Sequence, residues 1–422
     1  RDVAPSRGLG DVYKRQLGFC GADIRPAGPR EFHGRGLDAL IPWLEYARDL
    51  GASGLLLGPI FESATHGYDT LDHMHIDVRL GGDAAFDRLI TACRDMGLQV
   101  ILDGVFNHVS RNHPAVQASL DEAAGRLDPA DNPWHGLVRT HVGDNGEPTL
   151  DVFEGHDDLV ALDHSSDKTV DYVARVMNYW LDRGAAGWRL DAAYAVPSAF
   201  WARVLPQVKA THPDSWVFGE VIHGDYPRIV EESTMDSVTQ YELWKSIQHA
   251  LETENFFELD WNLKRHNSFL DSFVPQTFIG NHDVTRIASQ IGSAKAALAV
   301  AVLLTVGGVP SIYYGDEQGY VGVKQERFGG DDDIRPKFPD SPSNLSTLGE
   351  PIYRLHQALI ALRRRNPWLI DARTEALELE NKHFVYRSVS ADAQHSLTVD
   401  LNIEQSPTFT IRNADGSTAY QY

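Results

Sequence analysis

The sequence predicts an α/β protein whose core is a closed barrel of eight parallel strands, a (β/α)₈ TIM barrel, with an inserted domain and a small antiparallel β domain added. Three observations predict this fold. Short apolar runs alternate with longer stretches of helical periodicity. Acids and histidines come directly after several of the apolar runs. The alternation breaks over residues 109–162 and again after Pro367.

The composition of the 422 residues suits a large folded core, with 42% hydrophobic and 10% aromatic residues. The formal net charge of -21 argues against nucleic acid as a partner, because an acidic surface repels phosphate backbones. No apolar run reaches the roughly 18 residues of a membrane span, so we expect no membrane insertion. The sequence does not indicate an oligomeric state.

The first barrel strand is expected near residues 12–19, but Lys14, Arg15 and Gln16 would then lie in a buried strand, where unpaired charge is costly. We therefore interpret some of residues 1–16 as non-native sequence that arose in cloning or assembly. These residues have no apolar core of a signal peptide, which favours a cytoplasmic protein. A missing native N-terminus would leave secretion open.

The next part of the barrel is predicted from two pairs of helix and strand. Residues 37–50 have helical spacing, and residues 54–59 (GLLLGP) follow as a buried strand. Residues 84–96 form the next helix and residues 98–106 (LQVILDGVF) the next strand. Residues 109–162 are rich in Asp, Asn, Pro, Gly and His. We predict an inserted domain there, because a structureless loop of that length is uncommon.

The alternation resumes after the insertion. Helices are predicted over residues 167–182 and 351–365, and the apolar run 296–306 is predicted to be a buried helix. The remaining strands are expected at residues 185–191, 216–220, 237–242, 276–283 and 311–317.

The barrel would therefore consist of residues 17–108 and 163–367. After Pro367, alternating segments such as HFVYRSV and FTIRN are separated by turn residues. This pattern predicts the small antiparallel β domain over residues 368–422.

Charged and polar side chains gather at the carboxyl ends of the predicted strands, which form the catalytic face of a (β/α)₈ barrel. They are Asp103 and His108 after strand three, Arg189 and Asp191 at strand four, Glu220 at strand five, and His282 and Asp283 at strand seven. A single acid at a strand end is more often a helix cap or a structural ion-pair partner. Recurrence at four strand ends of one barrel favours a shared site.

Asp191 and Glu220 have the properties that glycoside hydrolysis requires. Arg189 precedes Asp191 by two residues and points to the same side of the strand, where its guanidinium favours an ionised nucleophile. Glu220 is followed by Val221 and Ile222, and a partly apolar, like-charged setting would help it to retain a proton. Neighbouring strands lie roughly 4.8 Å apart, which suits the separation of about 5–5.5 Å between carboxyl groups in a retaining mechanism.

Four segments resemble the ordered motifs of glycoside hydrolase family 13, the α-amylase family. They are DGVFNH (103–108), GWRLDAAYAV (187–196), FGEVIH (218–223) and FIGNHD (278–283). The segments at 67–82, 159–170 and 308–319 are also similar to family segments. The resemblance covers residues 18–365 and a C-terminal β domain that is shorter than is usual in the family.

The resemblance implies that Asp191 is the nucleophile, that Glu220 protonates the leaving oxygen and then activates water, and that Asp283 holds sugar hydroxyls and stabilises the oxocarbenium-like state. It implies substrate-binding roles for a further set of residues. Arg189 would position Asp191, His108 and His282 would donate to sugar hydroxyls in subsite −1, and Tyr68 would stack under that sugar. Asp69, Asp103 and Arg286 or Arg335 would shape the pocket, and His223 is a further candidate for substrate binding. For Arg286, a surface or helix position is the alternative.

Asn107 matches a position that binds calcium in many α-amylases. Calcium takes about six to eight oxygen ligands, and Asn107 with Asp151, Asp157 and Asp158 is a partial set. We expect no required cofactor and leave calcium open. The sequence has no HExxH, paired CxxC or P-loop motif, so zinc proteolysis and nucleotide use are unsupported.

The string VIH, which ends at His223, looks closest to maltase, cyclomaltodextrinase and neopullulanase-like members. We therefore expect the substrate to be a short α-glucan oligosaccharide, with α-1,4 linkage favoured. A transglycosidase with the same three carboxylates remains an alternative. A non-catalytic scaffold should have lost a carboxylate, and a metal-dependent barrel hydrolase would need His and Asp ligands that we do not find.

Overall fold

The computed structural model describes residues 36–422 except 144–145, 326 and 328–329. Five strands in its centre form one parallel sheet in chain order. They are β1 (Gly54–Leu56), β4 (Gln99–Gly104), β10 (Gly187–Leu190), β11 (Trp216–Gly219) and β12 (Ser237–Val238).

The parallel run continues beyond this sheet. Thr239, directly after β12, forms a parallel bridge with the first residue of β13 (Gln276–Thr277), and β13 pairs with β14 (Val309–Pro310). Six of the eight predicted barrel strands therefore lie within the residues predicted for them and in the predicted order, and β14 follows them in place of the strand expected over residues 311–317. The strand expected near residues 12–19 and the proposed non-native segment 1–16 lie outside the described residues.

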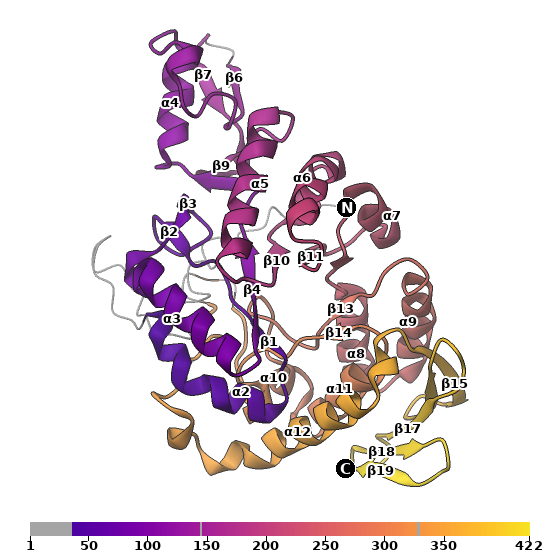
Figure 1. Ribbon diagram of the computed structural model, residues 1–422. Helices are drawn as coiled ribbons and strands as arrows, with labels where there is room; N and C mark the ends of the chain where they lie inside the picture. The colour runs from indigo at the N-terminus through magenta and orange to yellow at the C-terminus, as the bar shows by residue number, and fades with distance from the viewer. Residues whose placement is uncertain (1–35, 144–145, 326, 328–329) are drawn as a thin grey trace.

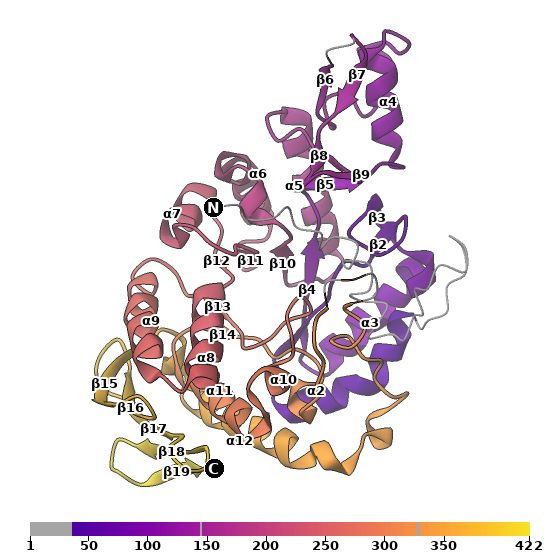
Figure 2. The same ribbon diagram turned by 180° about the vertical axis from the view of Figure 1, so that it is seen from behind.

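Helices surround the strands, as the views from the front and from behind show (Figures 1 and 2). They are α2 (Leu44–Leu50), α3 (Gly82–Asp95), α5 (Asp167–Asp182), α6 (Ser198–Thr211), α7 (Tyr226–Ser233), α8 (Tyr241–Thr253), α9 (Phe256–Phe269), α10 (Ile287–Ile291), α11 (Ser293–Thr305) and α12 (Glu350–Arg365). Among the described residues, no helix combines the length and apolar character needed to cross a membrane.

Helix α11 is buried on all sides from Ala296 to Thr305. A helix that is apolar all round has no face to offer to solvent, so it must be covered on both sides. Helices α8, α10 and α12 contact it, and so do strands β17 and β18 of the C-terminal sheet. The predicted buried helix over residues 296–306 is found here.

The predicted insertion 109–162 contains its own elements between β4 and α5. Three strands form an antiparallel sheet, two more form a hairpin, and one helix accompanies them. They are β5 (His108–Ser110), β8 (Val152–Phe153), β9 (His156–Ala161), β6 (Thr140–Val142), β7 (Pro148–Leu150) and α4 (Pro114–Ala123). Both ribbon views show α4, β6 and β7 standing out from the rest of the molecule (Figures 1 and 2). The predicted boundary at residues 108 and 109 falls inside β5.

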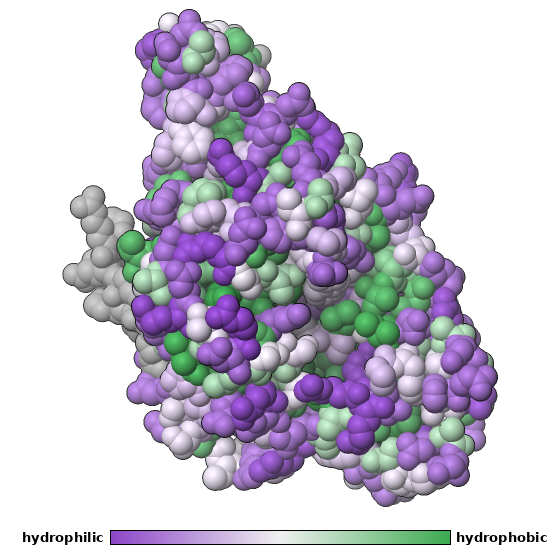
Figure 3. Space-filling model, viewed as in Figure 1, coloured by the Kyte–Doolittle hydropathy of each residue, from purple (hydrophilic) through white to green (hydrophobic). Residues whose placement is uncertain are grey.

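The predicted C-terminal β domain is confirmed. Five antiparallel strands pair in chain order: β15 (Arg373–Leu379), β16 (His383–Val389), β17 (Ser396–Asn402), β18 (Thr408–Asn413) and β19 (Thr418–Gln421). Buried residues alternate along β17, so one face of the sheet packs on the helices. The face of the molecule seen in Figure 3 is largely hydrophilic, with hydrophobic areas between the hydrophilic ones.

The helix predicted over residues 37–50 is divided into a 3₁₀ segment, η2 (Leu37–Trp43), and α2. Pro42 lies at the end of η2, and a proline in a helix interior removes a backbone donor and crowds the preceding turn. The remaining short connections are β2 (Phe61–Ser63), β3 (Thr70–Ile76), η3 (Val78–Leu80), η4 (Pro129–Asp131), η5 (Ala193–Ala195), η7 (Pro342–Asn344), η8 (Thr347–Gly349) and η9 (Pro367–Ile370).

The last three strands differ most from the predicted ranges. The strand expected over residues 237–242 ends at Val238, because the Gln240 side chain accepts from the Leu243 N–H and starts α8. The strand expected over residues 276–283 ends at Thr277. The strand expected over residues 311–317 lies earlier, at β14, and Gly315 in the left-handed region (φ 91°) begins the turn η6 (Asp316–Gln318).

Candidate active site

The carboxyl ends of β4, β10 and β11 bring four charged residues together. Arg189 lies opposite Asp103 in the pairing of β10 with β4. The Glu220 N–H donates to the Leu190 carbonyl at 2.9 Å, so Asp191 and Glu220 follow at the ends of two neighbouring strands. All four charged side chains are buried. The structure thus places next to one another the residues that the sequence predicted at the ends of strands three, four and five.

The Arg189 guanidinium lies between three carboxylates. Its Nη1 donates to both oxygens of Asp103 (2.7 and 2.8 Å) and to Asp191 Oδ1 (3.1 Å). Its Nη2 lies 2.8 Å from Glu220 Oε1. Burial alone would lower the pKa of Arg189, but the charges of Asp103 and Glu220 outweigh it and hold this pKa well above its usual value. The guanidinium therefore stays charged and holds the nucleophile and acid candidates together.

The three carboxylates share this one cation, and their mutual repulsion has a consequence. Burial raises the pKa of Asp103 most, Arg189 lowers it, and the neighbouring charges of Asp191 and Glu220 raise it again, to about 7. Asp103 therefore exchanges its proton near neutral pH, beside the Arg189 guanidinium.

Glu220 makes polar contacts in the partly apolar, like-charged setting expected for it. Besides Arg189, its Oε2 accepts from the Ala192 N–H at 3.0 Å. Ala192 has a left-handed backbone (φ 46°), which is costly for a residue with a Cβ, and directly follows Asp191. Val221 is buried, whereas Ile222 is 43% exposed. Neighbouring charges, more than apolar burial, set the environment of Glu220.

Asp283 lies on the loop after β13. Its N–H donates to Asn281 Oδ1 at 2.8 Å, its Oδ2 lies 3.1 Å from His282 Nε2, and its Oδ1 lies 3.4 Å from Arg335 Nη2. Arg335 also donates to the His282 carbonyl at 2.8 Å and pairs with Asp331. This loop is therefore held in a fixed conformation by a buried arginine.

Tyr241 connects this loop to Asp103, Arg189, Asp191 and Glu220, which together are called the carboxylate cluster. Its hydroxyl accepts from Asn281 Nδ2 at 3.0 Å and lies 3.5 Å from Glu220 Oε1. Burial, followed by the charges of Glu220 and Asp283, raises the pKa of Tyr241 well above its usual value. Asp191, Glu220 and Asp283, predicted on three different strands, thus border one site.

Tyr68 lies beneath the cluster, with its hydroxyl donating to Asp103 Oδ2 at 3.0 Å. His108 Nε2 donates to the Tyr68 carbonyl at 3.0 Å, while its Nδ1 accepts from Asn107 Nδ2 at 3.0 Å. Burial lowers the pKa of His108 to about 4, so the imidazole is neutral. Asp69 instead supports its own turn, accepting from Thr65 Oγ1 at 2.6 Å.

The two arginines proposed to shape the pocket have different positions. Arg335 contacts Asp283, as described above. Arg286 is fully buried, donates to Asp316 Oδ1 at 2.8 Å and lies under the Tyr313 ring at 4.5 Å. Arg286 therefore supports the segment after β14, which carries Tyr313 and Asp316, rather than contacting Asp283. His223 is exposed, with its ring 6.5 Å from that of Tyr194.

Sequence reasoning missed Tyr241 and Asn281. Tyr241 comes just after strand six, and strand ends are where functional residues of a barrel concentrate, so its position was a usable signal. Asn281 lies inside the motif FIGNHD. Phe153, whose ring stacks on that of His108 at 4.8 Å, had no sequence signal, because it belongs to the insertion.

The donors considered for calcium do not form a ligand set. The Asn107 amide donates to His108, and the Asp151 carboxylate lies 3.0 Å from His141 and 3.5 Å from Arg139. Asp157 and Asp158 are exposed. Within the described part of the chain, no group of three or more His, Cys, Asp or Glu residues could hold a metal ion. These residues do not fit a calcium site.

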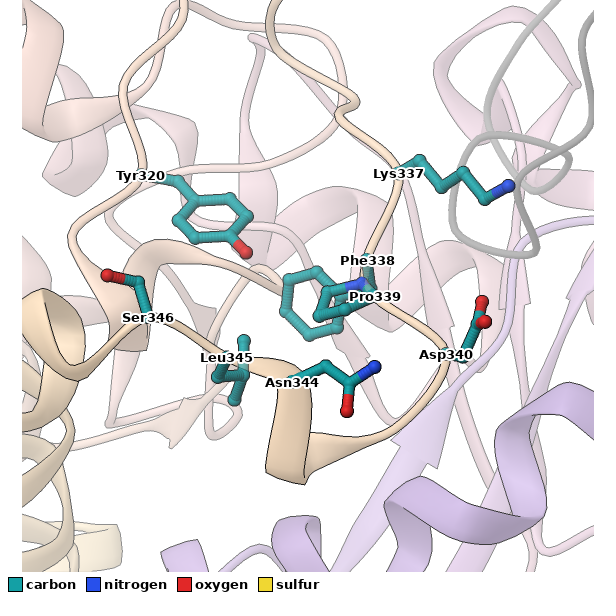
Figure 4. A pocket seen from close by; sticks show the side chains of 8 residues that line it. All are labelled: Tyr320, Lys337, Phe338, Pro339, Asp340, Asn344, Leu345 and Ser346. Atoms are coloured by element: carbon teal, nitrogen blue, oxygen red, sulfur yellow. The ribbon is translucent and has the colours of Figure 1, made fainter.

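An open hollow of about 540 Å³ lies next to the segment that carries Arg335 (Figure 4). Phe338 is one of the residues that line it and packs against Trp43, with ring centroids 4.7 Å apart. The hollow is lined by Tyr320, Lys337, Phe338, Pro339, Asp340, Asn344, Leu345 and Ser346. None of the four residues of the carboxylate cluster lines it.

Residues 31–347 match the family model of the alpha amylase catalytic domain. The maltogenic alpha-amylase of Bacillus acidopullulyticus is 29% identical over 362 residues, which cover 82% of this chain and 59% of that protein. The cyclomaltodextrinase of Geobacillus thermopakistaniensis is 29% identical over 387 residues, 89% of this chain and 63% of that protein. The chain thus spans less than two thirds of the length of these relatives.

Solved structures share the fold. The ligand-free cyclic α-maltosyl-(1→6)-maltose hydrolase of Arthrobacter globiformis superposes with a TM-score of 0.77 at 23% identity, covering 99% of this chain and 95% of that one. A cyclomaltodextrinase gives a TM-score of 0.73 at 25% identity, covering 90% and 64%. The fold is that of a TIM barrel with additional domains. Because the family model covers most of the sequence and its motifs lie at the predicted strand ends, the chain belongs to the α-amylase family, glycoside hydrolase family 13.

Proposed function

We propose that this protein is a retaining glycoside hydrolase that cleaves α-1,4-glucosidic bonds in short α-glucans. One observation carries the proposal: Asp191 and Glu220 follow paired residues of neighbouring strands and contact the two nitrogens of the same guanidinium. Two carboxyl groups so close together suit a double displacement, which needs a separation of about 5–5.5 Å. An inverting reaction needs more room, because water must enter between them.

In the first step, Asp191 attacks the anomeric carbon and forms a glycosyl–carboxylate bond, while the bond from that carbon to the leaving oxygen breaks. The leaving oxygen takes a proton from Glu220, which follows β11 beside Asp191 and contacts Arg189. Arg189 contacts both Asp191, which loses its negative charge in this step, and Glu220, which gains one. It keeps these two side chains in place.

In the second step, water attacks the anomeric carbon from the side that the leaving group has vacated. Glu220 accepts the proton of this water, the bond to Asp191 breaks, and the sugar leaves with its original anomeric configuration. Asp283, oriented by Asn281 and Arg335, would hold sugar hydroxyls and stabilise the oxocarbenium-like state. Tyr68 would lie under the sugar, and His282 would donate to it.

The names of the relatives support the substrate class. They include maltogenic amylases and cyclomaltodextrinases, whose names refer to α-glucans. We propose that catalysis here needs no metal cofactor, because the calcium donors considered do not come together.

The test is a product analysis with maltose, maltotriose, isomaltose, sucrose, trehalose, cyclodextrin and starch, with and without EDTA. We expect turnover of short α-1,4-glucans, release of the α-anomer first, and rates that EDTA leaves unchanged. Failure to turn over any α-glucoside would exclude the proposal, and a β-anomer as first product would exclude the retaining mechanism. Products longer than the substrate would instead indicate glycosyl transfer to sugar.

The nucleophile is tested with Asp191→Asn. We expect loss of essentially all activity, since an amide cannot form the covalent intermediate. Asp163→Asn is a matched control, because Asp163 accepts hydrogen bonds from Ser165 at the end of the insertion, outside the carboxylate cluster. Near-normal rates in Asp191→Asn would show that the nucleophile is another residue.

A further inference from the structure

The turn between β8 and β9 has a conformation that its residues do not favour. Glu154 has φ 48° and Gly155 has φ 78°, so both are in the left-handed region. Glycine and asparagine are the usual residues in such two-residue turns, and a glutamate there carries a conformational cost. A strained residue at the edge of an active site points to a function for its side chain.

This turn reaches two sides of the site. Phe153 stacks on His108, after strand three, with centroids 4.8 Å apart and planes at 20°. Glu154 Oε1 accepts from the Tyr194 hydroxyl at 3.1 Å, and Tyr194 belongs to the loop after strand four. The turn therefore extends across the mouth of the barrel from one strand end to the next.

Tyr194 places Glu154 on the side of Glu220. The Tyr194 N–H donates to the Glu220 carbonyl at 3.2 Å, and its ring lies 6.5 Å from His223, three residues beyond Glu220. Burial raises the pKa of Tyr194 most, and the charges of Glu154 and Glu220 raise it further, so the hydroxyl stays a donor. In the proposed reaction, Glu220 protonates the leaving oxygen, so the leaving sugar lies on this side.

We propose that Glu154, held by Tyr194, binds the leaving sugar through its hydroxyl groups and makes the enzyme selective for sugar over non-sugar leaving groups. The proposal rests on the proposed function. An exposed carboxylate accepts hydrogen bonds from adjacent hydroxyls. Asp191, Glu220 and Asp283 already make the mouth negative, so the ligand is a neutral polyol rather than an anion.

The test compares two substrates that share the glucosyl unit and differ in the leaving group. Maltotriose releases a sugar, whereas 4-nitrophenyl α-glucoside releases a phenol without sugar hydroxyls. Glu154→Gly removes the side chain and also relieves the backbone cost, so the variant should fold at least as well as the wild type. Tyr194→Phe removes the hydroxyl that holds Glu154.

For both variants we expect kcat/KM for maltotriose to fall by about 10-fold or more, the effect of losing hydrogen bonds to a charged group. For the aryl glucoside we expect a change within about 2-fold. Asp157→Asn, which alters an exposed acid on β9 of the same insertion, should change neither value. Melting curves check that each variant is folded.

Two outcomes would overturn the inference. Equal losses on both substrates would show that Glu154 supports the catalytic residues in general, and no loss on either would show that it does not contact the leaving sugar. In both cases a wild-type enzyme active on the two substrates would leave the proposed function intact. A wild-type protein that cleaves neither substrate would instead overturn the proposed function, and the inference with it.

Discussion

At the scale of single residues, Arg189 is the residue on which the site depends most. A guanidinium is a planar fork that can contact several carboxylates at once, whereas an ammonium group is a single point of charge. Arg189 uses this geometry to contact Asp103, Asp191 and Glu220. Without it, three buried carboxylates would be left to repel one another.

We predict that Arg189→Lys lowers kcat by about 100-fold or more, because one of the preorganised charges at the reacting centre is displaced. The acid limb of the pH–rate profile should move to higher pH, since the carboxylates then bind protons more tightly. The measurement is kcat as a function of pH. Arg203→Lys, at an exposed pair with Asp167, is the control and should behave as the wild type. A wild-type pH profile for Arg189→Lys would contradict the assigned role.

The site residues that the sequence predicted come directly after apolar runs, whereas those that it missed owe their roles to contacts with distant parts of the chain. Asp191 and Glu220 directly follow the apolar strands β10 and β11, and Asp283 lies on the loop after β13, so each charge comes after an apolar run. The roles of Tyr241 and Phe153 depend on distances to strands far away in the chain, and no local pattern encodes those distances. Arg286, in contrast, follows the motif FIGNHD by three residues in the sequence, but its side chain donates to Asp316 and not to Asp283. Three aromatic rings surround its guanidinium.

At the scale of elements, the segment after β14 shows how burial overrides a local pattern. The apolar and aromatic run SIYYGDE predicts a strand, but Gly315 turns the chain and buries Asp316 and Glu317. The Glu317 carboxylate accepts from the Tyr46 hydroxyl at 2.9 Å and from the Gly315 N–H at 2.7 Å. This acid therefore connects the last barrel strand to α2.

The buried acid makes stability depend on pH. Burial raises the pKa of Glu317 to about 7, although the Tyr46 hydrogen bond opposes the rise. In the unfolded chain a glutamate has a pKa of about 4.3. Between these two values the folded protein retains a proton that the unfolded chain has lost, so the free energy of unfolding decreases as pH rises through this window.

We predict that Glu317→Gln becomes increasingly stable relative to the wild type between about pH 5 and pH 8, because the amide has no proton to lose. Urea unfolding at a series of pH values measures the difference. Glu404→Gln, at an exposed position between β17 and β18, should show a constant difference. A constant difference for Glu317→Gln as well would show that this carboxyl titrates normally.

At the scale of the whole molecule, the C-terminal sheet and the barrel share one core. The Tyr386 and Thr305 hydroxyls are hydrogen-bonded at 2.6 Å, and Ser388 donates to the Thr305 carbonyl at 2.6 Å. The ring of Phe256, at the start of α9, lies 5.9 Å from that of Phe384 in β16. The small β domain is therefore part of the structural support of the barrel.

Two neighbouring phenylalanines test this shared core. Phe256 is fully buried, whereas Phe257 is 49% exposed. We predict that Phe256→Ala lowers the free energy of unfolding by about 3–5 kcal/mol, as expected for an aromatic ring removed from a core. Phe257→Ala should change it by roughly 0.5 kcal/mol or less. Denaturant unfolding measures both, and similar losses in the two variants would show that the packing between sheet and barrel contributes little.

Most of the fold was predictable because its signals are local. Helices α2, α3, α5, α11 and α12, six of the central strands and the C-terminal sheet follow from periodicity and turn residues. The contact of the insertion with the active site was not predictable, because it depends on a turn between two short strands and on one tyrosine beyond strand four. The position of the last strand was missed by a few residues, since pairing with β13 at Thr277 decides it.

The burial of α11 on all sides also affects how the chain must be made. Protein synthesis proceeds from the N-terminus, so α11 leaves the ribosome well before β17 and β18, which contact it, have been translated. During that interval one side of an entirely apolar helix has no native cover. A nascent chain that pauses before β17 would expose a surface prone to aggregation, and protection by chaperones would matter most at that stage of its synthesis.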